Sequence, residues 1–114
     1  MMNPYKDCIK SCIECFIACE ACLTTSLQSK EAKEMAASIQ LERQCADMCK
    51  TAVSLMLHQS THAQRLCEMC IKACQQCAQE CAKHNTHAYY RHCMKACEQC
   101  AQECEKVAML KQAA

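Results

Sequence analysis

The residues best suited to chemistry in this sequence are its cysteines, sixteen in 114 residues. Between Cys67 and Cys81 the chain reads CEMCIKACQQCAQEC, so these cysteines are separated by steps of three, four, three and four. Alternating steps of three and four keep side chains on one stripe of a helix that faces a neighbouring helix. The full set, in four segments, is Cys8, Cys12, Cys15, Cys19 and Cys22; Cys45 and Cys49; Cys67, Cys70, Cys74, Cys77 and Cys81; Cys93, Cys97, Cys100 and Cys104. The spacing predicts helices whose inward seam is made of sulfur.

Thiolates in such a seam are typical of a metal site, because soft sulfur ligands select Cu(I), zinc or iron–sulfur clusters. Zinc takes four ligands in a tetrahedron, so each zinc ion would have to draw on two or more helices. Cu(I) is satisfied by two thiolates, which would lie about 4.5 Å apart if the metal–sulfur bond resembles that of zinc. Pairs four residues apart on one helix, such as Cys8 and Cys12, reach that separation. One monovalent ion per thiolate also cancels the charge of a buried thiolate array. The pattern therefore favours multiple Cu(I) ions.

Two other metal-binding functions stay open, a helical zinc buffer and an iron–sulfur redox or electron-transfer protein. The ferredoxin run C-x2-C-x2-C-x3-C-P is missing, and a continuous helix spreads its ligands along a line. The C-x-x-C pairs lack the βαβ context of a redox enzyme, and no enzymatic activity is expected. Disulfides within one helix are disfavoured, because the Cβ atoms lie about 5–6 Å apart and a disulfide needs about 3.8 Å. Bridges between helices, or thiols that act only as small core side chains, are the remaining alternatives.

Length and composition predict one domain over residues 1–114 with a small aliphatic core. Only fifteen residues are Leu, Ile, Val or Phe, and the net charge is only +1. Interleaved charges near neutrality give no footprint for nucleic acid. No apolar run of about 18 residues is present, so no membrane span is expected. The start, MMNPYKDCIK, has no apolar signal region, and we expect a cytoplasmic protein with reduced thiols.

Glycine is absent and Pro4 is the only proline, so short polar breaks must separate the helices. Asn3 is a good helix cap before Pro4, and Ser29 is another plausible cap. Thr61 followed by Gln64 resembles a capping box. We predict an all-α, antiparallel up-down-up-down four-helix bundle with a cysteine-lined interior. Its helices span about residues 4–27, 30–58, 62–83 and 87–110.

Three further features follow from this arrangement. The inward stripe of the second helix is predicted to be Met35, Ser38, Leu41, Cys45, Cys49, Ala52 and Met56. The first helix carries a second apolar set, which predicts either a subunit interface or a wide stripe packed on both neighbours: Ile9, Ile13, Phe16, Ile17 and Leu23. His84, His87 and His92 gather at one end of the bundle, where imidazoles could pass metal from solvent to the thiolates.

At these residues the sequence resembles the cytosolic copper storage proteins, a family of cysteine-rich four-helix bundles. The matching segments cover nearly the whole chain: CIKSCIECFIACEAC, LERQCADMC, CEMCIKACQQCAQECAKH and CMKACEQCAQEC. The resemblance implies an interior that holds many Cu(I) ions, a tetramer of bundles, and a role in storage or detoxification. It implies as ligands the sixteen cysteines, with His84, His87 and His92 at the mouth. The expected partners are copper ions, delivered by a copper chaperone or a small thiol.

The sequence also departs from the family pattern. Ser26 and Ser38 stand where the stripes of the first two helices could have carried further cysteines, and Thr25 offers no thiol either. We therefore expect a thinner sulfur lining near the histidine end.

Overall fold

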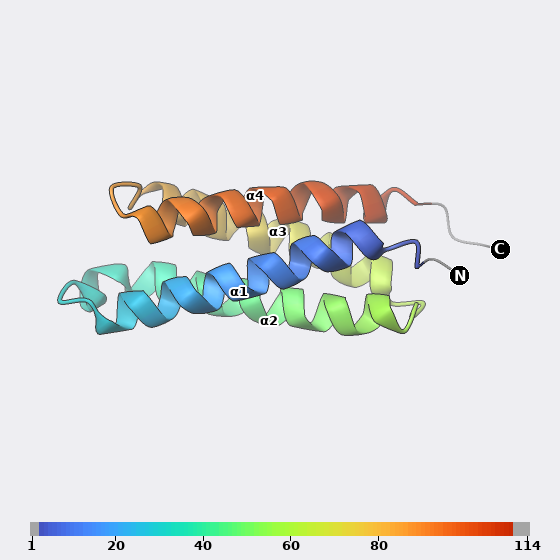
Figure 1. The fold of residues 1–114 in the computed structure, drawn as a ribbon, viewed down its shortest axis with the longest axis horizontal. Helices are drawn as coiled ribbons and strands as arrows, with labels where there is room; N and C mark the ends of the chain where they lie inside the picture. Colours follow the sequence, from blue (N-terminus) through green and yellow to red (C-terminus); the bar gives the residue numbers. More distant parts are fainter. Residues whose placement is uncertain (1–2, 111–114) are drawn as a thin grey trace.

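The computed structural model describes residues 3–110, and within them the chain forms helices and no strand. The elements are α1 (Lys6–Gln28), the short 3₁₀ helix η1 (Ala32–Met35), α2 (Ala36–Leu57), α3 (Ala63–Ala82) and α4 (Ala88–Ala108). Successive long helices run in opposite directions (Figure 1). The predicted antiparallel four-helix bundle with a cysteine-lined interior is confirmed.

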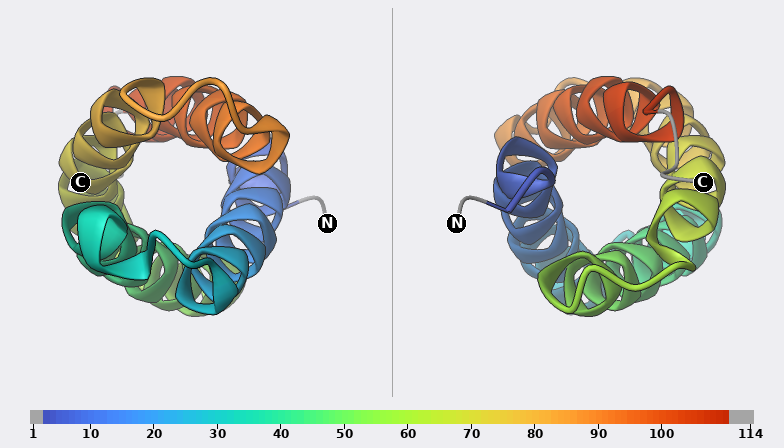
Figure 2. Two further views of the ribbon diagram at one scale, coloured as in Figure 1. Left: turned by 90° about the vertical axis from the view of Figure 1, so that its left-hand side faces the viewer. Right: turned by 90° about the vertical axis from the view of Figure 1, so that its right-hand side faces the viewer.

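Each long helix packs against two others, as the views along the bundle show (Figure 2). Among the described residues, the diagonal pairs α1/α3 and α2/α4 have no Cα atoms within 8 Å of each other. The backbones therefore surround a central axis that only side chains can fill. No helix in residues 3–110 is long and apolar enough to cross a membrane.

The helix ends differ in part from the prediction. The N-cap residue of α1 is Tyr5, without a side-chain cap, so the predicted capping by Asn3 is wrong. The Asn3 side-chain oxygen instead accepts a hydrogen bond from the Tyr5 N–H at 2.9 Å and supports the turn before the helix. α1 ends at Gln28, close to its predicted end at about residue 27. α2 begins only at Ala36, after η1, whereas its start was predicted at about residue 30. Ser29 accepts a hydrogen bond from the Glu31 N–H at 3.1 Å and so supports the turn between the helices.

The turn between α2 and α3 contains the only positive φ angle among the described residues, 51° at Gln59. The Ser60 N–H donates to the Leu55 carbonyl at 2.9 Å, and the Gln59 N–H donates to the Met56 carbonyl at 3.1 Å. This is a Schellman-type helix end, in which glycine usually occupies the left-handed position. Because the sequence lacks glycine, Gln59 adopts that conformation.

The capping box predicted at the start of α3 is not formed. The helix begins after His62 without a side-chain cap, and Gln64 reaches α4 instead. Its amide donates to the carbonyl oxygens of Val107 and Leu110, at 3.0 and 2.5 Å. Gln64 therefore ties the start of α3 to the end of α4.

The second apolar set of α1 is divided by the fold. Ile9 and Leu23 are buried in the bundle, whereas Ile13 and Ile17 are 42% and 59% exposed. Part of the set therefore packs on neighbouring helices, and part forms an apolar strip on the outer surface.

Candidate metal centre

All sixteen cysteines are free thiols, and every one is buried. Cys8 is the most exposed of them, at 3%. Together they form what we call the thiol column, which runs along the bundle axis. The 3–4 spacing of the cysteines places one or two sulfurs per helical turn on this axis. Sulfurs from different helices lie at the same height along it.

Sulfur atoms of different helices approach closely along the column. Cys12 lies 3.6 Å from Cys100, and Cys49 lies 3.7 Å from Cys70. Four such thiols converge at one level, with every pair of sulfurs within 4.8 Å: Cys12, Cys49, Cys70 and Cys100. The next all-cysteine groups share members with their neighbours along the axis: Cys15, Cys49, Cys74 and Cys100; Cys15, Cys19, Cys45 and Cys97; Cys19, Cys77, Cys93 and Cys97.

Several neighbouring sulfurs form nearly equilateral triangles. Cys12, Cys100 and Cys104 are separated by 3.6, 3.9 and 4.0 Å. Three sulfurs around one ion, each at the zinc–sulfur distance of about 2.3 Å, would lie about 4.0 Å apart. The pairs four residues apart are closer than the 4.5 Å predicted for linear coordination, for example 4.0 Å for Cys100 and Cys104. The column therefore fits a three-coordinate ion directly and a two-coordinate ion after a small side-chain rotation.

Hydrogen bonds between thiols shift the pKa values of individual cysteines in opposite directions. The pKa of Cys45 is lowered, because a thiolate there accepts hydrogen bonds from Cys15, 3.7 Å away, and from its other sulfur neighbours. The pKa of Cys49 is raised, because it shares a hydrogen bond with Cys100 at 3.8 Å and is buried. Without metal, only part of the column can carry negative charge.

A polar layer closes the column at the end where α1 meets η1 and α3 meets α4. The hydroxyl groups of Ser26 and Tyr90 lie 2.7 Å apart, and Ser26 also donates to the Cys22 carbonyl at 2.9 Å. Burial raises the pKa of Tyr90 to about 12, so the phenol is neutral. Ser38 donates to Glu80 at 3.4 Å. The serines expected to thin the sulfur lining are both buried in this layer.

The structure brings two of the three candidate histidines to this end. His84 packs on Tyr90 with ring centroids 4.9 Å apart, and its Nε2 lies 3.9 Å from Glu80. His87 lies beside Tyr89 and has its Nε2 3.9 Å from Glu31. His92 does not join them, because it is exposed and lines a groove on the outer surface between α1 and α4.

Sequence reasoning missed Glu42, which is fully buried beside the column. It takes the inward position of α2 that the prediction gave to Leu41, which is only partly buried. The 3–4 spacing through residues 38, 42, 45 and 49 was the available signal. Burial raises the pKa of Glu42 to about 7. Its carboxylate groups with three thiols, those of Cys22, Cys81 and Cys93.

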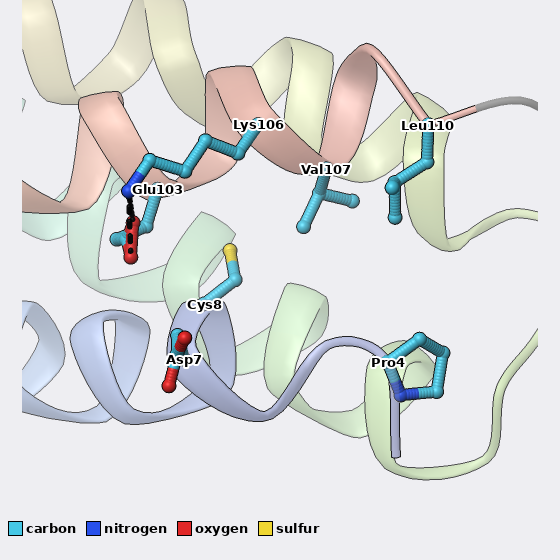
Figure 3. Close-up of a pocket in the computed structure, with 7 residues that line it drawn as sticks. All are labelled: Pro4, Asp7, Cys8, Glu103, Lys106, Val107 and Leu110. Atoms are coloured by element: carbon cyan, nitrogen blue, oxygen red, sulfur yellow. Dashed lines mark hydrogen bonds and ion pairs between the residues drawn. The ribbon is translucent and has the colours of Figure 1, made fainter. Parts of the chain in front are cut away.

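At the opposite end of the column, thiols lie beside a thioether. Cys67 donates to the thioether of Met56 at 3.7 Å, and Cys8 donates to Cys104 at 3.6 Å. A pocket of about 160 Å³ between the start of α1 and the end of α4 reaches Cys8 (Figure 3). Glu103 forms an ion pair with Lys106 at 2.9 Å at the edge of this pocket. Cys8 is thus the thiol that lines a surface pocket at this end.

Comparison with known proteins gives consistent results. The family model described as "Copper storage protein" matches residues 1–109. A Bacillus subtilis protein named "Uncharacterized cysteine-rich protein YhjQ" is 37% identical over 85 residues, which cover 74% of this chain and 79% of the relative.

Solved structures agree with this assignment. Apo-Csp3, copper storage protein 3 from Bacillus subtilis, has a TM-score of 0.85 at 37% identity, with 90% of this chain and 97% of that chain covered. A cytosolic copper storage protein from Streptomyces lividans, described with five coppers, has a TM-score of 0.90 at 26% identity, with 95% and 94% covered. The resemblance in the cysteine segments is therefore confirmed, and this chain belongs to the copper storage protein family.

Proposed function

We propose that this protein stores multiple Cu(I) ions on the thiolates of its column. The observation that carries the proposal is the burial of all sixteen free cysteines along one axis. Packing alone does not account for such an array, because alanine, valine or leucine would fill the same space without oxidisable thiols. The copper-loaded Streptomyces structure supports the choice of metal.

The geometry favours Cu(I) over zinc as the main cargo. Adjacent four-cysteine groups have ligands in common, for example Cys15 and Cys100. Tetrahedral ions with four sulfurs of their own therefore cannot occupy all of the groups at once. Ions that need only two or three sulfurs can share thiolates along the whole column. One positive charge per ion also balances the thiolates with little excess charge in the bundle.

The cellular setting belongs to the same proposal. We infer a cytoplasmic protein that sequesters copper without catalysing a reaction and receives it from a copper chaperone or a small thiol. Reduced thiols require such a compartment. His84 and His87 lie where an arriving ion would meet the closed end of the column, next to Tyr90. His92 is proposed as a ligand only for ions at the outer surface.

We further propose that the bundles assemble into a homotetramer through the exposed strip of α1. Ile13 and Ile17 are exposed, and Ile13 lines a small groove with Phe16, Lys50 and Val53. An adjacent row of apolar side chains on a small domain is typical of an interaction surface.

Anaerobic titration of the reduced protein with Cu(I), against a competing chelator, tests the storage function. We expect binding well above one Cu(I) per two cysteines, with about one proton released per thiol. Saturation near one metal per four cysteines would support the zinc buffer instead. Charge-transfer colour in protein purified without oxygen would support an iron–sulfur cluster.

A variant tests whether the column holds the copper. The double substitution Cys12→Ser and Cys100→Ser removes two corners of the triangle completed by Cys104. We expect it to lose at least about one Cu(I) per chain, because three-sulfur and two-sulfur sites there both vanish. Ser54→Ala, at an exposed position of α2, is the matched control and should bind as the wild type does.

A further inference from the structure

Glu42 has an environment that the storage function does not explain. Its side chain is fully buried, and one carboxylate oxygen, Oε1, has no hydrogen-bond partner. The other oxygen accepts a weak hydrogen bond from the Cys81 thiol at 3.8 Å. Among residues 3–110, no lysine, arginine or histidine forms an ion pair with it. Buried carboxylates without a cationic partner are rare unless they coordinate a metal ion.

The donors around Glu42 make a complete four-coordinate set. One oxygen of Glu42 and the sulfurs of Cys22, Cys81 and Cys93 lie within 4.8 Å of one another. They come from all four long helices, α2, α1, α3 and α4 respectively. The four donor atoms therefore reach this point from four different helices and can surround one ion, as tetrahedral coordination requires.

The chemistry of this set differs from that of the rest of the column. Cu(I) prefers sulfur and would leave the harder carboxylate oxygen as an unpaired buried charge. Zn²⁺ accepts cysteine sulfur and carboxylate oxygen together in tetrahedral geometry. A divalent ion here would also remove the cost of burying the Glu42 carboxylate. The all-cysteine groups contain no carboxylate, so a divalent ion gains nothing of this kind there.

We propose that Cys22, Cys81, Cys93 and Glu42 form a Zn²⁺ site at the histidine end of the thiol column. In this proposal the site takes the first Zn²⁺ that the metal-free chain binds. The group shares Cys93 with the neighbouring all-cysteine group of Cys19, Cys77 and Cys97. The remaining ligands of the site lie outside that neighbouring group. The three thiols of the site also belong to the thiol column, so full copper loading competes with Zn²⁺ for all three.

The test begins with reduced, metal-free protein and one equivalent of Zn²⁺, without oxygen. X-ray absorption at the zinc edge should show three sulfurs at about 2.3 Å and one oxygen at about 2.0–2.2 Å. Four sulfurs, or a first shell of oxygen and nitrogen only, would overturn the proposal. This measurement needs no substitution, so it does not depend on the folding of a variant.

Competition titration of Zn²⁺ with a chelator then compares variants. Glu42→Gln should bind the first Zn²⁺ at least about tenfold more weakly than the wild type, since a neutral amide is a poor ligand. Glu103→Gln, which alters a buried glutamate at the other end, should match the wild type. Equal Zn²⁺ affinity in wild type and Glu42→Gln would overturn the assignment. The Cu(I) stoichiometry is measured separately, so the storage function and the Zn²⁺ site can fail independently.

Discussion

The buried carboxylate of Glu42 makes the stability of the metal-free protein depend on pH in a defined direction. Burial raises the pKa of Glu42 from its ordinary value of 4.5 to about 7. Between these two values the folded protein keeps a proton on Glu42 that the unfolded chain has lost. The favourable contribution of the protonated carboxyl is therefore complete below about pH 4.5 and is lost as the pH rises through about 7. The substitution Glu42→Gln removes this dependence.

The magnitude follows from the shift in pKa. At about 1.4 kcal/mol for each pH unit, a change from 4.5 to about 7 corresponds to about 3.5 kcal/mol. That is a large part of the free energy of unfolding of a small domain, about 5–15 kcal/mol. We expect the free energy of unfolding of Glu42→Gln, relative to that of the wild type, to rise by about 3.5 kcal/mol between about pH 4.5 and 7.5.

The assay is urea unfolding of reduced, metal-free protein, followed by far-ultraviolet circular dichroism at a series of pH values. Comparing the two proteins at each pH removes the contribution of the thiols, which both share. Glu103→Gln is the control. Its free energy of unfolding relative to the wild type should change by less than about 1 kcal/mol over the same pH range, because the partner of Glu103, Lys106, is largely exposed. If the difference in free energy of unfolding between wild type and Glu42→Gln stays constant with pH, burial does not raise the pKa of Glu42 and the reasoning is refuted.

Three further outcomes are expected from other parts of the structure. Gln59→Gly should raise the free energy of unfolding by about 0.5–1 kcal/mol, measured by urea unfolding, because glycine adopts the left-handed conformation at φ 51° without strain. Tyr90→Phe should lower the same quantity by about 1 kcal/mol, because the 2.7 Å hydrogen bond to Ser26 is lost while that hydroxyl keeps its other partner. Ile13→Lys together with Ile17→Lys should leave the helical content unchanged and reduce the molar mass in light scattering toward that of one chain. An unchanged mass would exclude this strip as the interface.

The thiol column could be predicted from the sequence because its pattern repeats. Each cysteine segment carries the 3–4 spacing, and a helix with that spacing has a single inward face. The side chains between the cysteines are mostly charged, amide or small, as in CEMCIKACQQCAQEC, so the cysteine face was the clear candidate for the core side of α3 and α4. The number of helices followed from the absence of glycine and from the short polar breaks.

The errors lie where residue type and position disagree. Leu41 was expected inside because leucine is apolar, but the spacing from Ser38 to Cys45 places Glu42 on the inward face. His92 precedes Cys93 directly, and neighbouring residues on a helix point about 100° apart. An inward Cys93 therefore turns His92 away from the column. The 3₁₀ helix before α2 has no comparable signal, since its residues also suit an α-helix.

The two ends of the column differ in the groups that they offer to Cu(I). At the end near Cys8, the last donors are Cys67, Cys104 and the thioether of Met56, so soft ligands continue to the edge of the bundle. At the other end, the buried groups include the carboxylate of Glu42 and the hydroxyls of Ser26 and Tyr90, which do not suit Cu(I), as well as the thioether of Met35. On the proposed route past His84, an ion would cross a layer of hydroxyl groups that binds Cu(I) poorly, which would favour its transfer inward to the thiols.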